Sequence, residues 1–83
     1  MWAAQAWDAY LWWQTEDRKV LKRVNDLIKD IRRHGNEGIG KPIPLKHGFQ
    51  GYWSRRITDE HRLVYKVEGD EIRIAACRYH YGK

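Results

Sequence analysis

Apolar residues recur at steps of three and four in the stretch DRKVLKRVNDLIKDIRR, residues 17–33. This spacing gathers them on one stripe of an α-helix, while every other position of the stretch is polar or charged. The stripe consists of Val20, Leu21, Val24, Leu27, Ile28 and Ile31. The pattern therefore predicts an amphipathic helix that must bury one face against another element. Thr15 or Asp17 can cap its start, and Gly35 can end it.

A second, shorter helical pattern precedes this stretch. Its stripe consists of Ala3, Ala6, Trp7, Tyr10, Leu11 and either Trp13 or Gln14. We expect the two helices to form a hairpin through a turn near residues 15–17. Trp12 and Trp13 are neighbours and therefore lie about 100° apart around a helix, so one of them must leave the stripe. That tryptophan is a candidate for a protein interface.

The second half of the chain has the features of strands. Residues 35–44, GNEGIGKPIP, contain too many glycines and prolines for a regular element. Strand patterns follow at residues 52–57, 61–67 and 71–79, joined by short links that favour an antiparallel meander. We therefore predict an α+β fold in which two N-terminal helices pack on one face of a small antiparallel β-sheet. The other face stays open for function.

Length and composition exclude several classes of protein. The 83 residues, 42% hydrophobic and 33% charged, suit one compact domain spanning residues 1–83. Cys77 is the only cysteine, which excludes an intramolecular disulfide and favours a reducing cytoplasm. The histidines lack the spacing of a metal site, so we expect neither a metal nor another cofactor. No apolar run approaches the roughly 20 residues needed to cross a bilayer, so we expect no membrane span.

Positive charge is concentrated in one part of the chain. The whole chain has a net charge of +5, and residues 41–66 carry six Lys or Arg against two Asp or Glu, an excess of 6 − 2 = 4. A local field of this sign attracts nucleic acid or an acidic protein partner. A basic, solvated surface without a partner is the alternative.

Candidate site residues gather in the same half of the chain. RNA cleavage needs a base for the 2′-hydroxyl proton, cations for the phosphorane charge and an acid for the departing 5′-oxygen. His80 titrates near neutral pH and is the candidate acid, although a hydrogen-bonded packing role is the alternative. The candidate phosphate ligands are Lys46, Arg56 and Arg62, and Tyr79 or Tyr81 can stack on an unpaired base. The expected RNA-binding set is Lys46, His47, Arg55, Arg56 and Tyr79, and His61 lies in the same cluster.

Three blocks of the sequence resemble the signature of a known family. They are GKPIPLKH (residues 40–47), GYWSRRITDEHRLVYKV (51–67) and AACRYHY (75–81), and residues 7–33 are similar to the helical hairpin of the same family. On these blocks the chain resembles the YoeB branch of the RelE/ParE toxin superfamily. The resemblance implies a RelE-like microbial RNase fold. It also implies a toxin of a bacterial type II toxin–antitoxin system, an endoribonuclease that enters the A site of the 70S ribosome and cuts mRNA without a metal.

The resemblance also implies partners and residue roles. The partners are a second copy of the chain, in a homodimer, and a YefM-like antitoxin whose tail folds along the toxin and disturbs its catalytic end. The phosphate-binding cations of the family match Lys46, Arg56 and Arg62, its histidine acid matches His80, and its functional terminal tyrosine matches Tyr81.

One departure from the family concerns the general base. The family has a glutamate between two prolines, in the context KPEP, whereas this sequence has Ile43 in KPIP. Isoleucine cannot accept a proton, and loss of a positioned base typically costs about 10²- to 10⁴-fold in rate. We therefore expect a weakened or inactive endoribonuclease that still binds its target.

Two further departures concern the sheet. The chain begins about three residues short of the family pattern, so we expect the first strand to be lost or reduced to a stub. In the last strand, strict alternation places His80 on the same face as Ile72, Ile74 and Ala76, which have the character of core residues. A bulge, or a strand end that runs past the helices, is needed to turn His80 into the site.

Two other functions remain as alternatives. A ParE-like relative would share the fold and poison DNA gyrase by binding; the basic and histidine-rich cluster argues against this function, and Ile43 argues mildly for it. A non-catalytic module would only dock on RNA, the ribosome or an acidic antitoxin segment.

Overall fold

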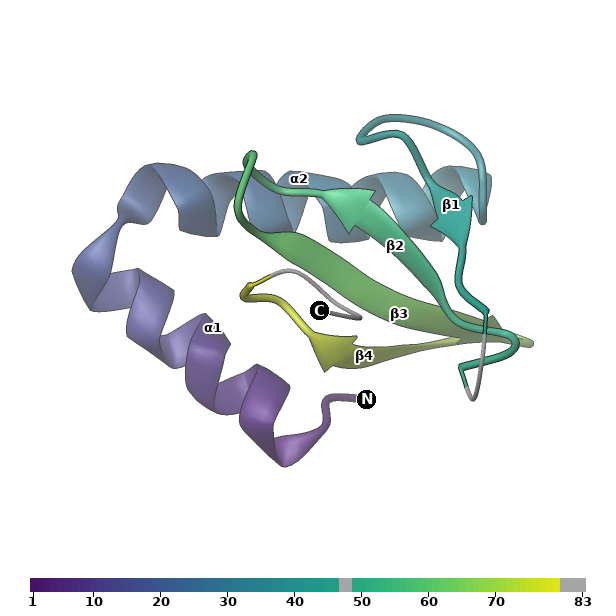
Figure 1. Cartoon of the computed structure of the whole chain (residues 1–83), viewed down its shortest axis with the longest axis horizontal. Helices are drawn as coiled ribbons and strands as arrows, with labels where there is room; N and C mark the ends of the chain where they lie inside the picture. The colour runs from purple at the N-terminus through teal and green to yellow at the C-terminus, as the bar shows by residue number, and fades with distance from the viewer. Residues whose placement is uncertain (47–48, 80–83) are drawn as a thin grey trace.

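The computed structural model describes residues 1–46 and 49–79. In these two stretches the chain forms two helices and a four-stranded antiparallel sheet, which confirms the predicted α+β fold (Figure 1). The helices are α1 (Ala4–Glu16) and α2 (Arg18–His34), and the strands are β1 (Ile43–Pro44), β2 (Trp53–Arg56), β3 (Arg62–Glu68) and β4 (Glu71–Ala76). The strands pair in the order β1-β2-β3-β4, so each one lies beside the strand that precedes it in the chain.

α2 begins and ends at the signals that the sequence contains. The Asp17 side chain accepts hydrogen bonds from the backbone N–H groups of Lys19 and Val20, so Asp17 is the N-cap. At the other end Gly35 has a φ of 64° and donates its N–H to the Ile31 carbonyl at 2.8 Å. The buried residues of α2 are Val20, Val24, Leu27 and Ile31. The predicted amphipathic helix is therefore confirmed.

One face of the sheet packs against the helices. Alternate residues of β2 and β3 point to this face, where Leu63 and Tyr65 are fully buried in the same cluster as the α2 stripe. α1 contributes Trp13, whose indole donates a hydrogen bond from Nε1 to the Cys77 carbonyl at 3.0 Å. Its neighbour Trp12 is 37% exposed. One tryptophan of the pair therefore leaves the stripe, as the spacing predicts.

The outer face of the sheet is the face turned away from the helices. On β2 and β3 it carries Ser54, Arg56, Arg62 and Val64. The expectation that this face stays open is correct only in part, because Ser54 and Val64 are buried whereas Arg56 is exposed.

A β-bulge interrupts the pairing of β3 with β4. Val64 pairs with Ala76, but the next residue, Tyr65, pairs with Ile74, which leaves Ala75 as the extra residue. Side chains that follow the bulge therefore point to the opposite face from the one that strict alternation gives.

The bulge corrects the expected orientation of Ala76. Strict alternation placed this residue on the helix-covered face with Ile72 and Ile74, whereas it pairs with Val64 on the outer face. The structure therefore contains the bulge that the sequence analysis required before His80 can reach the site. His80 itself lies outside the described residues, so its orientation stays a prediction.

Residues 1–3 add a stub of a strand beside β4. Trp2 forms an isolated parallel bridge with Ile74. The Met1 amino group donates to the Ile72 carbonyl at 2.7 Å, and the Ala3 N–H donates to the Ile74 carbonyl at 2.9 Å. Of the two expectations for this strand, loss or a stub, the stub is confirmed.

β1 is an element that the sequence analysis missed. The expectation that residues 35–44 hold no regular element is wrong at their end, because Ile43 pairs with Ser54 and Pro44 pairs with Trp53. Proline has no N–H to donate and is tolerated on an edge strand such as β1. The site therefore includes a short strand where a loop was expected.

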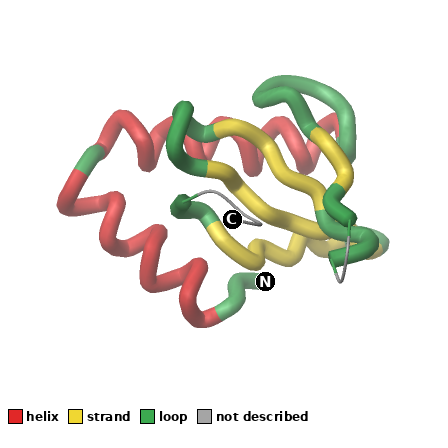
Figure 2. Tube along the Cα trace, viewed as in Figure 1, coloured by secondary structure: helices red, strands yellow, loops and turns green. Residues whose placement is uncertain are grey.

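A buried arginine connects β2 to the loop between α2 and β1. Arg55 is 0% exposed, and all five of its N–H donors are used. Nε donates to the Tyr65 hydroxyl (3.1 Å), Nη1 to the Asp30 carboxylate (2.6 Å) and the Ile39 carbonyl (3.0 Å), and Nη2 to the carbonyls of Gly35 (2.7 Å) and Glu37 (2.8 Å). Figure 2 shows this loop beside the C-terminal end of α2. The guanidinium therefore fixes the path that leads into β1.

Glycine is required where this loop passes Asp30. Gly38 has a φ of 124°, and a Cβ atom at this position would collide with the Asp30 carboxylate. The neighbouring Ile39 N–H donates to the same carboxylate at 3.1 Å. The loop can therefore lie directly against the ion pair that Asp30 forms with Arg55.

We predict that Arg55→Met destabilises the fold by about 3–5 kcal/mol, because it leaves the Asp30 carboxylate and three carbonyls without their donor. Urea denaturation measures this loss. The matched control is Arg73→Met, since the half-exposed Arg73 side chain bonds to Glu68 at 2.8 Å and to no other residue that the structure describes, and such a surface pair contributes about 0–1 kcal/mol. Equal losses in the two variants would contradict the structural role of Arg55.

Acid should weaken the fold through Asp30. The hydrogen bond from Arg55 holds the pKa of the Asp30 carboxyl below its ordinary value of 3.8. A lowered folded-state pKa stabilises the protein above the unfolded pKa, and this contribution is lost as the pH falls through the folded value. We therefore expect the stability difference between the native chain and Asp30→Asn to shrink between about pH 5 and pH 2 in urea titrations. A difference that stays constant over this range would refute the expectation.

Candidate functional site

Two arginines face each other across β2 and β3. Arg56 and Arg62 are directly opposite in the antiparallel register, so their side chains start from the same outer face. Like charges in this arrangement repel each other, and an anion between them relieves the repulsion. The structure therefore brings together two of the three predicted phosphate ligands.

The surroundings of these arginines leave donors available. The Arg62 Nη1 donates to the carbonyls of Thr58 (2.6 Å), His61 (3.0 Å) and Asp59 (3.2 Å), which holds its side chain on the loop between β2 and β3. Its Nε and Nη2 make no hydrogen bond to the described residues. The Arg56 side chain is 45% exposed, and its Nη1 lies 4.0 Å from the Asp59 carboxylate.

Ile43 lies in the adjacent row of the same face. It is opposite Ser54 on β2, and Ser54 is opposite Val64 on β3. Ser54 and Arg56 are two residues apart on one strand, so their side chains point to the same side. Ile43 is 57% exposed, which leaves its position accessible from solvent. The register therefore places Ile43 on the face that carries both arginines.

The remaining predicted RNA-binding residues are divided between described and undescribed parts of the chain. Lys46 is exposed and follows β1 by two residues. Tyr79 is exposed and follows the end of β4. His47, His80 and Tyr81 lie outside the described residues, so their roles stay predictions.

The expectation that Arg55 binds RNA is wrong. Its guanidinium is buried and already donates all of its hydrogen bonds inside the protein. A signal was present in the sequence, because Arg55 alternates with Trp53 and Ile57 and therefore shares their apolar, helix-facing side of the strand.

The backbone at Tyr79 is held against the start of β3. The Tyr79 N–H donates to Nδ1 of His61 at 2.8 Å, and the Arg62 N–H donates to the Tyr79 carbonyl at 3.2 Å. Tyr79 has a φ of 66°, a left-handed conformation that a non-glycine residue keeps only when its surroundings hold it. These two bonds therefore fix the residue that directly precedes His80.

His61 is a positioning residue for this segment, a role that the sequence analysis did not assign. Its ring packs edge-on against Trp13 at a centroid distance of 4.9 Å, and the tilted Tyr79 ring lies at 5.6 Å. Nδ1 can accept the Tyr79 N–H only in the neutral ring that carries its proton on Nε2. No local pattern in the sequence indicates this contact, because His61 and Tyr79 are far apart in the chain and only the fold brings them together.

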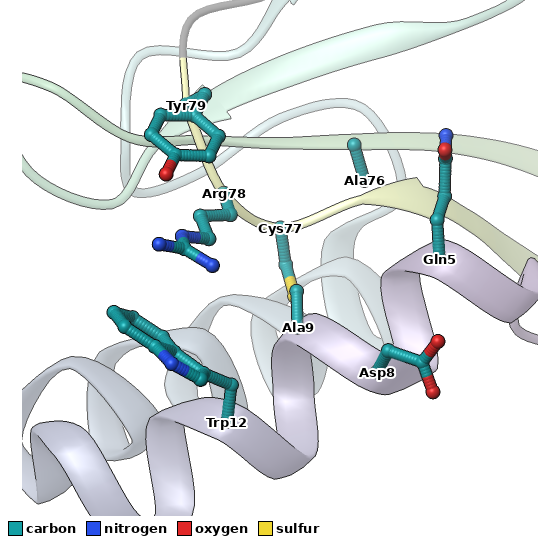
Figure 3. Close-up of a pocket in the computed structure, with 8 residues that line it drawn as sticks. All are labelled: Gln5, Asp8, Ala9, Trp12, Ala76, Cys77, Arg78 and Tyr79. Atoms are coloured by element: carbon teal, nitrogen blue, oxygen red, sulfur yellow. The ribbon is translucent and has the colours of Figure 1, made fainter.

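A pocket of about 450 Å³ adjoins this segment, between α1 and the end of β4 (Figure 3). Gln5, Asp8 and Trp12 line it from α1, and Arg78 and Tyr79 line it from the other side. The Arg78 guanidinium carbon lies 3.6 Å from the Trp12 ring centroid and 4.5 Å from the Tyr79 ring centroid. The sequence analysis did not identify this pocket, because it forms only when α1 packs beside the last strand.

Cys77 contributes packing to the site region. It is fully buried, and its Sγ lies 3.4 Å from the Ala6 carbonyl, to which the thiol donates. Burial raises the pKa of the Cys77 thiol to about 11. The group therefore stays protonated at neutral pH and is a poor nucleophile.

Two kinds of structural feature are absent from the described residues. Within residues 1–46 and 49–79, no cluster of three or more His, Cys, Asp or Glu side chains is placed to hold a metal ion. Over the same residues, no helix is both long enough and apolar enough to span a membrane.

Comparisons with known proteins agree on one family. The family model for the YoeB-like toxin of bacterial type II toxin–antitoxin systems matches residues 2–81. Toxin YoeB of Escherichia coli K12 is 59% identical over 81 residues, which cover 98% of this chain and 96% of the relative. Toxin YoeB of Synechocystis is 55% identical over 76 residues, which cover 92% of this chain and 88% of the relative.

Solved structures give the same result. A YoeB–YefM complex from Staphylococcus aureus contains a chain that superposes with a TM-score of 0.93 at 49% identity, with 98% of this chain and 94% of that chain covered. A YoeB/ParE toxin from Agrobacterium tumefaciens superposes with a TM-score of 0.94 at 46% identity, covering 98% and 96%. YafQ of E. coli, at 18% identity and a TM-score of 0.72, shares the fold.

We predict that His61→Ala speeds hydrogen exchange of the Tyr79 amide by about fivefold, the equivalent of one lost hydrogen bond of about 1 kcal/mol. His61→Asn is the matched variant, because its side-chain oxygen can take the place of Nδ1 and should restore much of the protection. His61→Gln carries its oxygen one bond farther out and should not. Equal protection in all three variants would exclude the proposed hold on Tyr79. NMR-detected exchange provides the measurement.

Proposed function

The chain belongs to the YoeB-like toxin family of bacterial type II toxin–antitoxin systems, and on this premise we propose that it is a ribosome-dependent endoribonuclease toxin. The proposed substrate is mRNA in the ribosomal A site, which places the activity in the cytoplasm. The observation that carries the proposal is the pair of arginines, Arg56 and Arg62, opposite each other on the outer face. A fold that places two like charges in register suits the binding of a phosphodiester.

The proposed reaction uses cationic side chains and a side-chain acid, while the proton of the 2′-hydroxyl passes to solvent water because Ile43 cannot accept it. The deprotonated 2′-oxygen attacks the phosphorus, the bond to the 5′-oxygen breaks, and negative charge builds on the phosphorane. Arg56 and Arg62, with Lys46, would bind this charge more strongly in the transition state than in the ground state. His80 would give a proton to the departing 5′-oxygen, and Tyr81 would support this end of the site.

Ile43 separates binding from cleavage in this proposal. Its side chain is exposed on the same face as the arginines, but it has no atom that can accept the 2′-hydroxyl proton. Arg56 and Arg62 lie on β2 and β3 and do not depend on the side chain at this position. We therefore infer a toxin that binds its RNA target with a cleavage rate that is strongly reduced.

The proposed partners follow from relatives whose structures are solved. Chains from S. aureus are described as a YoeB dimer and as a heterotetrameric YoeB–YefM complex, and they superpose on this chain with TM-scores of 0.93. We propose that this chain likewise forms a homodimer and binds a YefM-like antitoxin. The net charge of +5 favours an acidic antitoxin segment as well as RNA.

We predict that Ile43→Glu raises the rate of ribosome-bound mRNA cleavage by about 10²- to 10⁴-fold, because it supplies a proton acceptor beside the arginines. The matched control is Ile39→Glu. Ile39 is also exposed (43%), and its replacement adds the same negative charge to the neighbouring loop. Cleavage is measured by mapping the 5′ ends of mRNA in a purified translation system.

Three results would count against the proposal. If neither variant cleaves mRNA faster than the native chain, the base lies elsewhere or the chain is a binding module. If both variants gain equally, the added charge acts without the geometry of the site. If the protein instead blocks DNA supercoiling by gyrase and leaves translation intact, the ParE-like alternative is correct.

A further inference from the structure

The pocket beside Tyr79 has the size and the mixed lining of a ligand site. Its volume of about 450 Å³ falls within the roughly 300–1,000 Å³ of small-molecule sites. Figure 3 shows Asp8 and Gln5 at one end and Trp12, Arg78 and Tyr79 at the other. Ala9 and Ala76 lie between the two ends, and their short side chains leave the hollow.

The cationic end of the pocket contains the N–H donors of the Arg78 guanidinium. Arg78 is held in place by the rings of Trp12 and Tyr79, at 3.6 Å and 4.5 Å from its guanidinium carbon. Its Nε is buried and has no hydrogen-bond partner in the described part of the chain. Because a buried donor without a partner is costly, an acceptor that reaches this guanidinium would be bound favourably.

The opposite end has acceptors. Neither the Asp8 carboxylate nor the Gln5 amide forms a hydrogen bond or ion pair with any described residue. A carboxylate repels phosphate, so this end of the pocket does not suit the RNA backbone. This end of the pocket does suit N–H donors, and in RNA such donors lie on the edges of the bases.

We propose that this pocket binds an unpaired guanine base of the RNA. Guanine presents adjacent N–H donors on N1 and N2, which fit the two oxygens of Asp8, and the acceptors O6 and N7, which fit the fork of Arg78. Adenine, cytosine and uracil each lack the paired donors. The proposal rests on the proposed function, because it requires that the chain binds RNA.

The position of the pocket relative to the arginines supports this assignment. Tyr79 lines the pocket, and its backbone is bonded to His61 and to Arg62. Arg62 in turn lies opposite Arg56. A phosphate at the two arginines and a base in the pocket would therefore belong to neighbouring parts of one RNA strand.

The experiment compares short single-stranded RNAs that differ at one base. The probes are labelled uridine pentanucleotides with guanine, inosine, adenine or uracil at the centre, and anisotropy gives their affinities for the full chain. We expect guanine to bind about 5- to 150-fold more tightly than adenine, as one bidentate base contact provides. Inosine, which lacks the 2-amino group, should fall in between.

Variants test the residues. Asp8→Asn should abolish the preference for guanine and leave the affinity for the all-uridine probe unchanged or slightly higher. The matched control, Glu16→Gln, removes an exposed carboxylate at the end of α1 outside the pocket and should keep the preference. Arg78→Lys should also weaken the preference, because lysine lacks the planar fork.

Several results would overturn the assignment. One is equal binding of all four probes, and another is a guanine preference that survives in Asp8→Asn. If guanosine monophosphate competes as strongly as the guanine pentanucleotide, the pocket belongs to a free nucleotide. If Asp8→Asn lowers the affinity for a YefM-like antitoxin and leaves the RNA affinities unchanged, the pocket is the binding site of a protein partner. Failure of the proposed function is distinguishable, because it appears as an absence of mRNA cleavage in the Ile43→Glu assay, whereas the guanine preference is measured by binding alone.

Discussion

The buried guanidinium of Arg55 holds together the part of the fold on which the site depends. A charge removed from water is tolerated only when it is paired and fully hydrogen-bonded, and Arg55 meets both conditions through Asp30, Tyr65 and the loop carbonyls. That loop leads directly into β1, and its last glycine, Gly40, accepts the Arg56 N–H at 2.7 Å. The position of Ile43 relative to the arginines is therefore a consequence of the bonds that Arg55 makes.

Arg55 and Arg56 are neighbours with identical side chains, but the alternation of a β-strand points one into the protein and the other to the outer face. Successive residues of β2 point to opposite faces, so Arg55 faces α2 and Arg56 faces outward. The first arginine is surrounded by its own acceptors, whereas the second lies opposite another cation, Arg62. Charge in the first position therefore stabilises the fold, and charge in the second is available to an external anion.

Local signals in the sequence predicted the helices well. The features that the sequence did not predict depend on contacts between residues far apart in the chain. α2 was predictable because the Asp17 cap, the apolar stripe and Gly35 all lie within or next to the helix. β1 was not, since its pairing depends on a loop held by Arg55 from a different strand. The bulge at Ala75 depends on the register with β3, and the pocket depends on how α1 packs beside β4.

Under the proposed function, the arrangement of the outer face also explains why a change of one side chain would alter cleavage without altering the fold. Arg56 and Arg62 lie on β2 and β3, whose pairing does not involve the side chain at position 43. β1 joins this sheet through backbone pairing at Ile43 and Pro44, and the Ile43 side chain is more than half exposed. A residue at such a position is constrained by little except its chemistry, because no core packing depends on it. Under the proposed function, the proton acceptor is therefore the most easily gained or lost part of the site, whereas the two arginines that would bind the phosphate are built into the sheet.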